Sequence, residues 1–317
     1  MKITRIALIG GSGFVGRHLS AHLRNRGYQC RIITRHAHRH RELRTAAEVV
    51  EADPFDRERL TEALRGCQAA VHLVGILNSA DGARSFRRVH VQLVEDVVTA
   101  CHAAKIVRLL HMSALNADQA SGGSQYLRSK GEGENRAHTL GRPGIAVTSF
   151  RPSVIFGPDD SFLNRFATLL RIPGPLPLAC PDAQLAPVYV GDVAAAFANA
   201  LEDPSTFGER YELCGPHAYT LEQLVRFVAR HSGSPHKVIL RMPDWASRLQ
   251  AQLLQYAPGR PFTPDNYQSL QVPSLCRHNG LAALGVTPQS LENVGARCLA
   301  EHHAPGLLDL LRRSSRR

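Results

Sequence analysis

The stretch Ile3–Gly16, with the sequence ITRIALIGGSGFVG, decides the fold of this chain. An apolar run with the length of a strand ends at Ile9, and a segment with helical periodicity follows over Phe14–Arg26. The connection consists of Gly10, Gly11, Ser12, Gly13, Phe14, Val15 and Gly16. Its glycines allow a tight turn, a close approach of the backbone to a pyrophosphate and close packing of a helix on a strand. Because the start of that helix offers free N–H groups to phosphate, the stretch predicts a dinucleotide-binding loop, with an ordinary glycine turn as the alternative.

Strands and helices alternate outward from this loop through the first half of the chain. The predicted strands are Ile3–Ile9, Cys30–Thr34, Ala47–Ala52, Ala69–Val74, Ile106–Met112 and Ile145–Phe150. The predicted helices are Phe14–Arg26, Asp56–Leu64, Ser85–Ala104 and Gln125–Thr139. Short β-rich runs separated by helices indicate βαβ crossovers. We therefore expect an α/β fold with a doubly wound parallel sheet of the Rossmann type.

The composition changes after about residue 151, where prolines become frequent. Sheet-compatible pieces occur at Pro187–Val190 and Glu209–Cys214, and further helices are expected at Gly191–Leu201, Leu221–His231 and Asp244–Tyr256. We expect a dinucleotide-binding domain over residues 1–150 and a smaller C-terminal substrate lobe over residues 151–317. The strands and helices near residues 187–214 are expected to return to the Rossmann sheet.

The composition indicates a folded, cationic protein. Of the 317 residues, 44% are hydrophobic, and the net charge of +11 favours anionic partners such as a phosphorylated cofactor, nucleic acid or a membrane surface. No run of about 18 apolar residues occurs, so no transmembrane segment is expected. The first strand begins at Ile3, which leaves no room for a signal peptide. Seven cysteines without a CxxC pair predict reduced, mostly buried thiols in a cytoplasmic protein.

The residues after the second predicted strand indicate which dinucleotide binds. An acidic residue at this place holds the ribose 2′-hydroxyl of NAD(H), whereas an arginine accepts the 2′-phosphate of NADP(H). Here Arg35 follows the strand, and no acidic residue occurs before Glu42. The sequence therefore predicts NADP(H) in preference to NAD(H). Asp53 follows the third strand, where its carboxylate would either contact the adenine amine or cap the next helix.

A second motif, YLRSK over Tyr126–Lys130, carries a candidate reactive pair. The spacing of four puts Tyr126 and Lys130 on the same face of a helix. A free tyrosine with a pKa of about 10 is a poor base at neutral pH. A nearby ammonium stabilises the phenolate and lowers that pKa, so that the phenol can exchange a proton with a substrate oxygen. A surface tyrosine and lysine are the alternative.

With these motifs the chain resembles the extended short-chain dehydrogenases/reductases over residues 3–300. The resemblance rests on the glycine loop, the acidic turn after the third strand, the YxxxK pair and the segment RPSVIFGP over Arg151–Pro158. It implies that the segment Arg151–Pro158 passes near the nicotinamide and that Lys130 holds the nicotinamide ribose. The cofactor site is then expected to include Val74, Gly75, Lys130, Pro152 and Val154 besides the glycine loop, Arg35 and Asp53.

Two sequence segments resemble one particular branch of this family. HLVGIL over His72–Leu77, together with YLRSK, is similar to an atypical branch that includes the NADPH-binding accessory subunit of respiratory complex I. Bacterial relatives of that subunit are described as NAD-dependent epimerase/dehydratase-like proteins, and a related branch is linked to ubiquinone synthesis. The resemblance implies a respiratory or quinone-synthesis protein as a partner.

The chain departs from the extended enzymes at two catalytic positions. In those enzymes a hydroxyl after the fifth strand, often on the second residue of a pair, bonds the reacting oxygen. Here the pair is Ser113-Ala114, so the hydroxyl sits one residue early, and Ser124 is the substitute that we consider. A family asparagine on the fourth helix aligns with His90, which would either relay protons or pack as an ordinary helix histidine.

Other patterns carry less chemistry. His18 and His22 lie four apart without an HExxH motif or a cysteine pair, so no metal site is expected. Arginines and lysines are not interleaved with aromatic residues, and no nucleic-acid partner is expected. The segment Leu307–Arg317 combines leucines with arginines, which leaves open a weak peripheral contact with an anionic membrane such as the inner membrane, besides a flexible tail.

The sequence thus leads to three functional hypotheses. The first is an NADP(H)-dependent oxidoreductase or epimerase acting on an unidentified small molecule, with Tyr126 as acid/base and Ser113 or Ser124 polarising the substrate oxygen. The second is a protein that binds NADPH structurally and stabilises respiratory complex I or quinone-synthesis machinery. The third is a regulator that senses the redox state of NADP(H).

Overall fold

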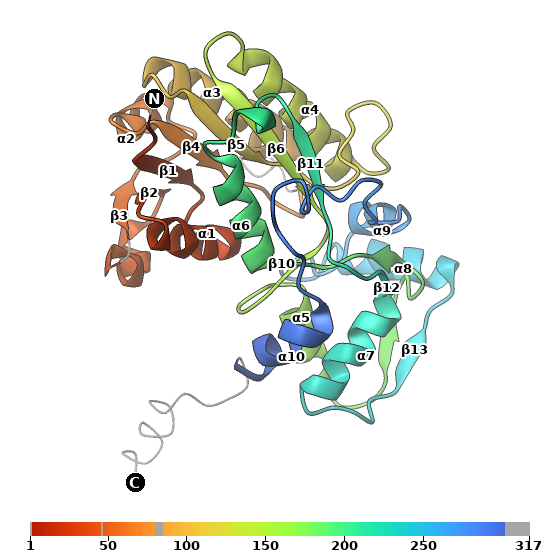
Figure 1. The fold of residues 1–317 in the computed structure, drawn as a ribbon. Helices are drawn as coiled ribbons and strands as arrows, with labels where there is room; N and C mark the ends of the chain where they lie inside the picture. The colour runs from red at the N-terminus through yellow and green to blue at the C-terminus, as the bar shows by residue number, and fades with distance from the viewer. Residues whose placement is uncertain (1, 46, 80–84, 302–317) are drawn as a thin grey trace.

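A seven-stranded parallel sheet forms the centre of the molecule (Figure 1). The structure is a computed structural model that describes residues 2–45, 47–79 and 85–301. The sheet has the strand order β11-β6-β5-β4-β1-β2-β3. Its strands are β1 (Arg5–Ile9), β2 (Gln29–Thr34), β3 (Glu48–Glu51), β4 (Ala69–His72), β5 (Arg108–Met112), β6 (Ala146–Pro152) and β11 (Arg210–Leu213). The predicted doubly wound α/β fold is therefore confirmed.

Helices cover both faces of this sheet, each through its own apolar core. On one face lie α1 (Phe14–Asn25) and α6 (Val190–Ala200), where Leu19 and Phe197 are fully buried in one cluster. On the other face lie α2 (Arg57–Leu64), α3 (Leu93–Ala103) and α4 (Gln125–Gly141), which pack Leu60, Val97 and Ala137 in a second cluster. The strands between them read as apolar runs because both sides of a parallel sheet are buried.

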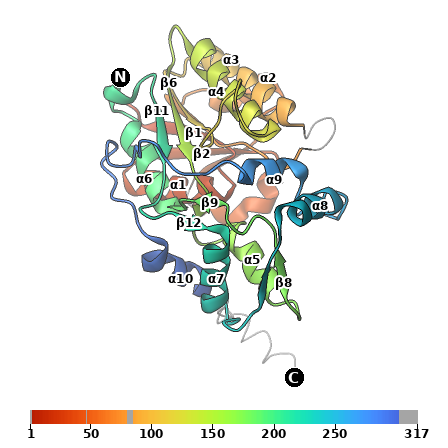
Figure 2. The ribbon, with the colours of Figure 1, turned by 90° about the vertical axis from the view of Figure 1, so that its right-hand side faces the viewer.

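The C-terminal lobe has its own apolar core beside the carboxyl ends of the strands. It contains α5 (Leu163–Leu170), α7 (Leu221–His231), α8 (Asp244–Leu254), α9 (Pro264–Leu270) and α10 (Leu291–Glu301). Three two-stranded ribbons pair β7 (Ile155–Phe156) with β10 (Val188–Tyr189), β9 (Gln184–Leu185) with β12 (Tyr219–Thr220), and β8 (Leu176–Leu178) with β13 (Ile239–Arg241). Figure 2 shows α9 between α8 and the sheet.

The chain crosses back from this lobe to the sheet. Strand β11 pairs with β6, and α6 packs against α1, so residues 190–213 complete the sheet and one of its helical layers. The strand expected at Pro187–Val190 is only β10, which pairs with β7 outside the main sheet. The helix expected at Ser85–Ala104 begins as a π-helical turn, η3 (Arg87–Gln92), before α3. None of the helices in the described ranges is long and apolar enough to span a lipid bilayer.

The expectation of reduced thiols throughout is wrong for two cysteines. Cys214, directly after β11, forms a disulfide with Cys276, 62 residues further along the chain. The side-chain amide of Asn279 donates to the Cys214 carbonyl, and the N–H of Gly280 donates to the Glu212 carbonyl. These hydrogen bonds hold the two segments together beside the disulfide. A pairing made by long-range backbone contacts leaves no signature in cysteine spacing. Cys30, Cys67, Cys101 and Cys298 are buried, as expected.

A buried carboxylate fastens α4 to the edge of the sheet. Glu134, fully buried on α4, accepts from Arg151 of β6 at 2.7 and 2.9 Å and lies 2.5 Å from the guanidinium of Arg210 on β11. Burial alone would raise the pKa of Glu134, but Arg151, Ser113 and Arg210 outweigh it and hold the pKa below its ordinary value. The carboxylate is thus ionised in the folded protein.

We expect Glu134→Gln to lower the free energy of unfolding by about 2–3 kcal/mol at pH 7, because two partly buried guanidinium groups lose their charged partner. A carboxyl whose pKa is lowered on folding stabilises the protein above the unfolded value of about 4.3, and this contribution is lost as the pH falls through the folded pKa. The variant lacks this part of the acid dependence. Urea unfolding between pH 7 and pH 3 measures both effects.

The matched control is Glu132→Gln on the same helix, a half-buried carboxylate outside this ion-pair cluster. Equal losses of stability in the two variants at pH 7 would contradict the role of Glu134.

Candidate functional site

The glycine loop lies where the chain crosses from one half of the sheet to the other. β1 lies between β4 and β2, so the loops after β1 and β4 meet at the carboxyl edge. A Cβ at Gly10 would come within 3.0 Å of the Val74 side chain, and one at Gly16 would come within 2.5 Å of the Gly11 backbone. The packing of α1 on its own loop therefore requires glycine at position 16. In α/β folds a switch of strand order at this edge is the usual place for a ligand.

The first turn of α1 is suited to an anion. Its N-cap residue is Gly13, without a side-chain cap, and no acidic residue lies in the first turn. By contrast, Asp56 caps α2 and Ser124 caps α4 through their side chains. The N–H of Gly13 donates to the carbonyl of Gly10, whereas the N–H groups of Phe14 and Val15 open a helix whose positive dipole end carries no competing carboxylate. These residues fit the pyrophosphate of a dinucleotide.

Arg35 and Asp53 flank this loop at the ends of β2 and β3. Arg35 follows Thr34 directly, is exposed and has no ion-pair or hydrogen-bond partner among the described residues. The Ser12 hydroxyl donates to Thr34 at 3.3 Å, which ties the glycine loop to the end of β2. The alternative that Asp53 caps the next helix is wrong, because Asp56 caps α2 and Asp53 accepts from the N–H of Phe55 in the preceding turn. A contact of Asp53 with adenine stays a prediction.

The segment after β6 lies next to the first turns of α1. Pro152 is the last residue of β6, and its carbonyl accepts from the N–H of Leu115, whereas the carbonyl of Val154 accepts from Val188. A Cβ at Gly157 would lie 3.4 Å from the ring of Phe14, the first residue of α1. The carbonyl of Pro158 lies 3.4 Å from Nε2 of His18 on α1. The segment that the sequence assigned to the nicotinamide end therefore packs against the glycine-loop helix.

Tyr126 and Lys130 lie in the first half of α4, at the carboxyl ends of β4 and β5. Lys130 is 5% exposed, and its ammonium donates to the carbonyl of Met112 at the end of β5 over 2.6 Å. A Cβ at Gly75 would lie 3.8 Å from Nζ of Lys130, so the loop after β4 borders the same ammonium. Burial lowers the pKa of Lys130 to about 8, although Glu134 partly opposes the shift.

The tyrosine differs from its expected state. Tyr126 is partly exposed, yet the surrounding protein raises the pKa of its phenol to about 12, by burial first and by the carboxylate of Asp265 second. The lowering expected from Lys130 is absent in this arrangement. Tyr126 is therefore a neutral phenol at physiological pH, and a neutral phenol can donate a proton but cannot remove one.

The C-terminal lobe holds the start of α4. Asp265 of α9 accepts from the backbone N–H groups of Gln125 and Tyr126, at 2.7 and 3.2 Å. The Ser124 hydroxyl caps the helix by accepting from the N–H of Leu127, and it also accepts from Ser269 of α9 at 2.7 Å. Ser124 is thus a buried helix cap, and this geometry does not favour the substitute role considered for it.

The second hydroxyl candidate, Ser113, lies near Glu134. Ser113 follows β5 and is buried, and its hydroxyl is directed at Glu134, whose pKa it helps to lower, without a hydrogen bond of ordinary geometry. Ala114, the next residue, carries no hydroxyl. Since adjacent residues of an extended segment point to opposite sides, the one-residue shift leaves the usual hydroxyl position filled by a methyl group.

His90 is buried in the helix layer. Its Nε2 accepts from the N–H of Ile76 at 3.1 Å, which leaves the proton on Nδ1 for the Ser129 hydroxyl at 2.8 Å. Ser129 in turn donates to the carbonyl of Tyr126. Burial first and Lys130 second lower the pKa of His90 to about 2, so the ring stays neutral. It connects the loop after β4 to the turn of α4 that carries the tyrosine.

Comparison with known proteins identifies the family. The NAD dependent epimerase/dehydratase family matches over residues 6–214, which include the glycine loop, Tyr126 and Lys130. The chain belongs to this family. The structure of Thermus thermophilus UDP-glucose 4-epimerase with NAD superposes with a TM-score of 0.75 and 20% identity, covering 96% of this chain and 100% of that one. This similarity supports the fold.

Two curated relatives of this family member are more similar in sequence. The rat mitochondrial NADH dehydrogenase [ubiquinone] 1 alpha subcomplex subunit 9 is 29% identical over 93% of this chain and 79% of its own length. The ceramide reductase of Caulobacter vibrioides is 28% identical over 75% of this chain and 74% of its own length. The expected similarity to a complex I subunit is thus confirmed.

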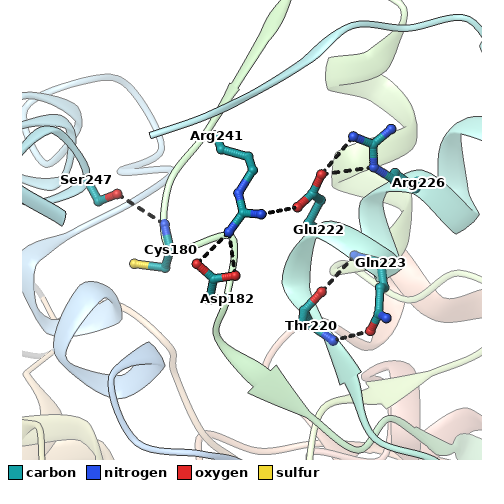
Figure 3. A network of polar contacts seen from close by, with 8 residues as sticks. All are labelled: Cys180, Asp182, Thr220, Glu222, Gln223, Arg226, Arg241 and Ser247. Atoms are coloured by element: carbon teal, nitrogen blue, oxygen red, sulfur yellow. Dashed lines mark hydrogen bonds and ion pairs between the residues drawn. The ribbon is translucent and has the colours of Figure 1, made fainter. Parts of the chain in front are cut away.

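The C-terminal lobe of this epimerase-family chain contributes to two cavities, of which one lies beside the site. One of about 350 Å³ lies beside Tyr126, because Phe86 and Gln125 line it and the Phe86 ring lies 6.0 Å from the tyrosine ring. The other, of about 470 Å³, lies farther out in the lobe between residues 180–184, α8 and the end of α9. Figure 3 shows three residues that line this outer cavity, Cys180, Asp182 and Ser247. It also shows how Arg241 joins Asp182 to Glu222.

The sequence analysis missed the polar residues that shape this site. Asp265 accepts from the N–H of Gln125 on α4, 140 residues away in the sequence. Two arginines form ion pairs with Glu134 of α4, namely Arg151, 17 residues away, and Arg210. His72 and His111, fully buried at the ends of β4 and β5, lie 3.1 Å apart through their Nδ1 atoms. Thr263 and Pro264 give the ordinary signal of a helix start, but no sequence signal directs Asp265 to another helix.

We expect the ammonium of Lys130 to titrate near pH 8, about two units below an ordinary lysine, because burial disfavours its charged form. The chain has only four lysines, so the signals of ¹³C-labelled lysine side chains in an NMR titration can be resolved. Lys130→Arg removes the signal and assigns it. Four lysines that all titrate together near pH 10 would contradict the buried position of Lys130.

Proposed function

We propose that this epimerase/dehydratase-family protein is an NADP(H)-dependent reductase of a small carbonyl compound. The observation that supports this most directly is the position of Tyr126 beside a cavity and one helical turn before the buried ammonium of Lys130. A neutral phenol at this place can donate a proton to a carbonyl oxygen, which is the proton transfer that carbonyl reduction requires.

Binding of NADP(H) is assigned to three groups of residues. The uncapped first turn of α1 and the glycine loop suit the pyrophosphate, and Arg35, exposed and unpaired among the described residues, suits a 2′-phosphate. Lys130 and Gly75, which lie close together, and the segment from Pro152 to Val154 are assigned to the nicotinamide end in this proposal. When bound, the nicotinamide supplies the hydride for the reaction.

The residues of the chain supply the proton and its control. In this proposal the phenol of Tyr126 donates its proton to the carbonyl oxygen as the carbon is reduced, which yields an alcohol and leaves a phenolate. Lys130 holds the nicotinamide ribose in this proposal, and its pKa of about 8 lets it remain charged at neutral pH. Phe86 packs at the edge of the tyrosine ring and keeps water from one side of it.

A carbonyl substrate is consistent with the names of two relatives. One is the ceramide reductase already described, and another is a ketoreductase of a farnesyl dihydroquinoline oxide from Stigmatella aurantiaca, 27% identical over 53% of this chain. The cavity beside Tyr126 combines the aromatic ring of Phe86 with polar side chains such as Gln125 and Gln268, which suit a carbonyl substrate that has both an apolar part and polar groups.

One observation favours a second candidate function, in which NADPH is bound structurally and the protein stabilises a respiratory or quinone-synthesis assembly. Ser113 is directed at Glu134 and Ala114 lacks a hydroxyl, so the usual donor to the substrate oxygen is missing. The similarity to a complex I subunit over 79% of that subunit agrees with this reading.

We expect Arg35→Ala to weaken NADPH binding roughly 10- to 100-fold, the effect of losing charged hydrogen bonds to a phosphate, and to leave NADH binding within about twofold. Titration of nicotinamide fluorescence measures both affinities on nucleotide-stripped protein. Arg39→Ala is the matched control, because Arg39 is an exposed arginine of the same segment. A wild-type protein with equal affinity for NADH and NADPH would contradict the NADP(H) assignment.

We expect Tyr126→Phe to reduce NADPH-dependent carbonyl reduction by 10²–10⁴-fold, while NADPH affinity stays within about twofold. Turnover is measured as NADPH oxidation with a panel of apolar ketones and quinone precursors. Equal turnover of the variant and the wild type would contradict the role of Tyr126. If NADPH binds tightly and no ketone is reduced, the structural function is favoured, and Tyr126→Phe should then leave the assembly of its partner unchanged.

A further inference from the structure

One face of α8 carries large apolar side chains that the described structure leaves exposed. Trp245, Leu249, Leu253 and Tyr256 are 70%, 47%, 64% and 85% exposed, respectively. Their spacing of four, four and three residues places them in a single stripe along the helix and its last turn. Single exposed apolar residues are ordinary on protein surfaces, but a continuous stripe of four, two of them aromatic, marks a contact surface.

The opposite face of α8 already has its packing partners. Ala246, Ser247 and Ala251 are buried, and the Ser247 hydroxyl accepts from the N–H of Cys180 (Figure 3). Helix α9 packs on the same side through Tyr267, whose hydroxyl contacts Asp244. In Figure 2, α8 lies at the outer edge of the lobe, with α9 between it and the sheet. The stripe therefore faces outward, and core packing does not account for it.

Basic side chains accompany the stripe. Residues 236–260 contain Lys237, Arg241, Arg248 and Arg260, against the single acidic residue Asp244. Arg241 is held by Asp182 and Glu222. Arg248 on α8 lies 3.8 Å from Asp244 and is still 64% exposed. The whole chain carries a net charge of +11. A helix with an aromatic and leucine face and arginines beside it is the type that lies in the interface of an anionic bilayer.

We propose that the α8 stripe docks the protein on anionic phospholipid membranes, with Trp245, Leu249, Leu253 and Tyr256 inserted among the lipid headgroups. Charge decides between this surface and the alternatives. A second copy of the chain would bring another +11, which opposes self-association, whereas an anionic bilayer attracts every exposed arginine and lysine. Trp and Tyr have an apolar ring with a polar tip and suit the membrane–water boundary.

Trp245 is the only tryptophan of the chain, so its fluorescence reports on the stripe alone. The full chain is mixed with two kinds of vesicle, one of phosphatidylcholine alone and one that also contains about 30–40% phosphatidylglycerol. The anionic lipid supplies the negative surface charge that attracts arginine and lysine. We expect flotation only with the anionic vesicles, a shift of Trp245 emission to shorter wavelength, quenching by lipids brominated on the acyl chain, and release when the salt concentration is raised to about 0.5 M.

The paired variant Leu249→Glu/Leu253→Glu should lower the affinity for anionic vesicles by about tenfold or more, because it removes apolar contacts and adds repulsion. The matched control is Val107→Glu/Leu140→Glu, which makes the same charge change at exposed apolar residues of the sheet domain. Circular dichroism and NADPH binding establish that both variants fold. Equal flotation of the two variants would overturn the proposal.

Other occupants of the stripe give different results, and each overturns the proposal. Emission already at short wavelength without vesicles, and independent of protein concentration, would mean that another segment of this chain covers Trp245. A blue shift that grows with protein concentration would mean that a second copy does so. Binding to neutral and anionic vesicles alike would mean that charge does not select the surface.

Discussion

The position of the candidate site depends on how closely α4 approaches the rest of the fold. A Cβ at Gly133 would come within 1.9 Å of the carbonyl of His90, so this helix touches the π-helical turn backbone to backbone. With α4 at that depth, Lys130 reaches the carbonyl at the end of β5 and Glu134 reaches the sheet edge. A side chain at position 133 would push α4 outward. It would displace the side chains of Tyr126, Lys130 and Glu134 together. The positions of Lys130 and Glu134 therefore depend on the absence of a side chain at position 133.

The electrostatics of this region favour neutral histidines around one lysine. His72, His90 and His111 are buried within reach of Lys130, and burial first, with Lys130 contributing, lowers the pKa of each of them. Since none of the three becomes charged at physiological pH, Lys130 is the cation of this part of the described structure. Its charge is balanced through Glu134, which in turn has two arginines from two different strands.

The sequence predicted the fold well because the fold is encoded locally. The glycine loop and the alternation of apolar runs with helical periods are short-range signals, and they gave the parallel sheet and the place of Tyr126 and Lys130 on one helix. The missed features are long-range. They are the disulfide of Cys214, the hydrogen bonds from α4 to Asp265, and the ion pairs of Glu134. These contacts join segments tens to more than a hundred residues apart, so their geometry follows only from the assembled fold. The pKa of Tyr126 was mistaken for the same reason, because burial and Asp265 are not visible in the YxxxK spacing.

The bonds from Asp265 have a mechanical consequence for this family member. Asp265 belongs to α9 of the C-terminal lobe, yet it holds the first backbone N–H groups of the helix that carries Tyr126. The hydroxyl of Ser269 on the same short helix donates to Ser124, so three hydrogen bonds connect the lobe to one end of α4. Any shift of α9 would therefore act on the first turn of α4, whereas the close contact at Gly133 fixes the same helix further along. The orientation of the phenol thus depends on the C-terminal lobe as well as on the sheet domain that carries its helix.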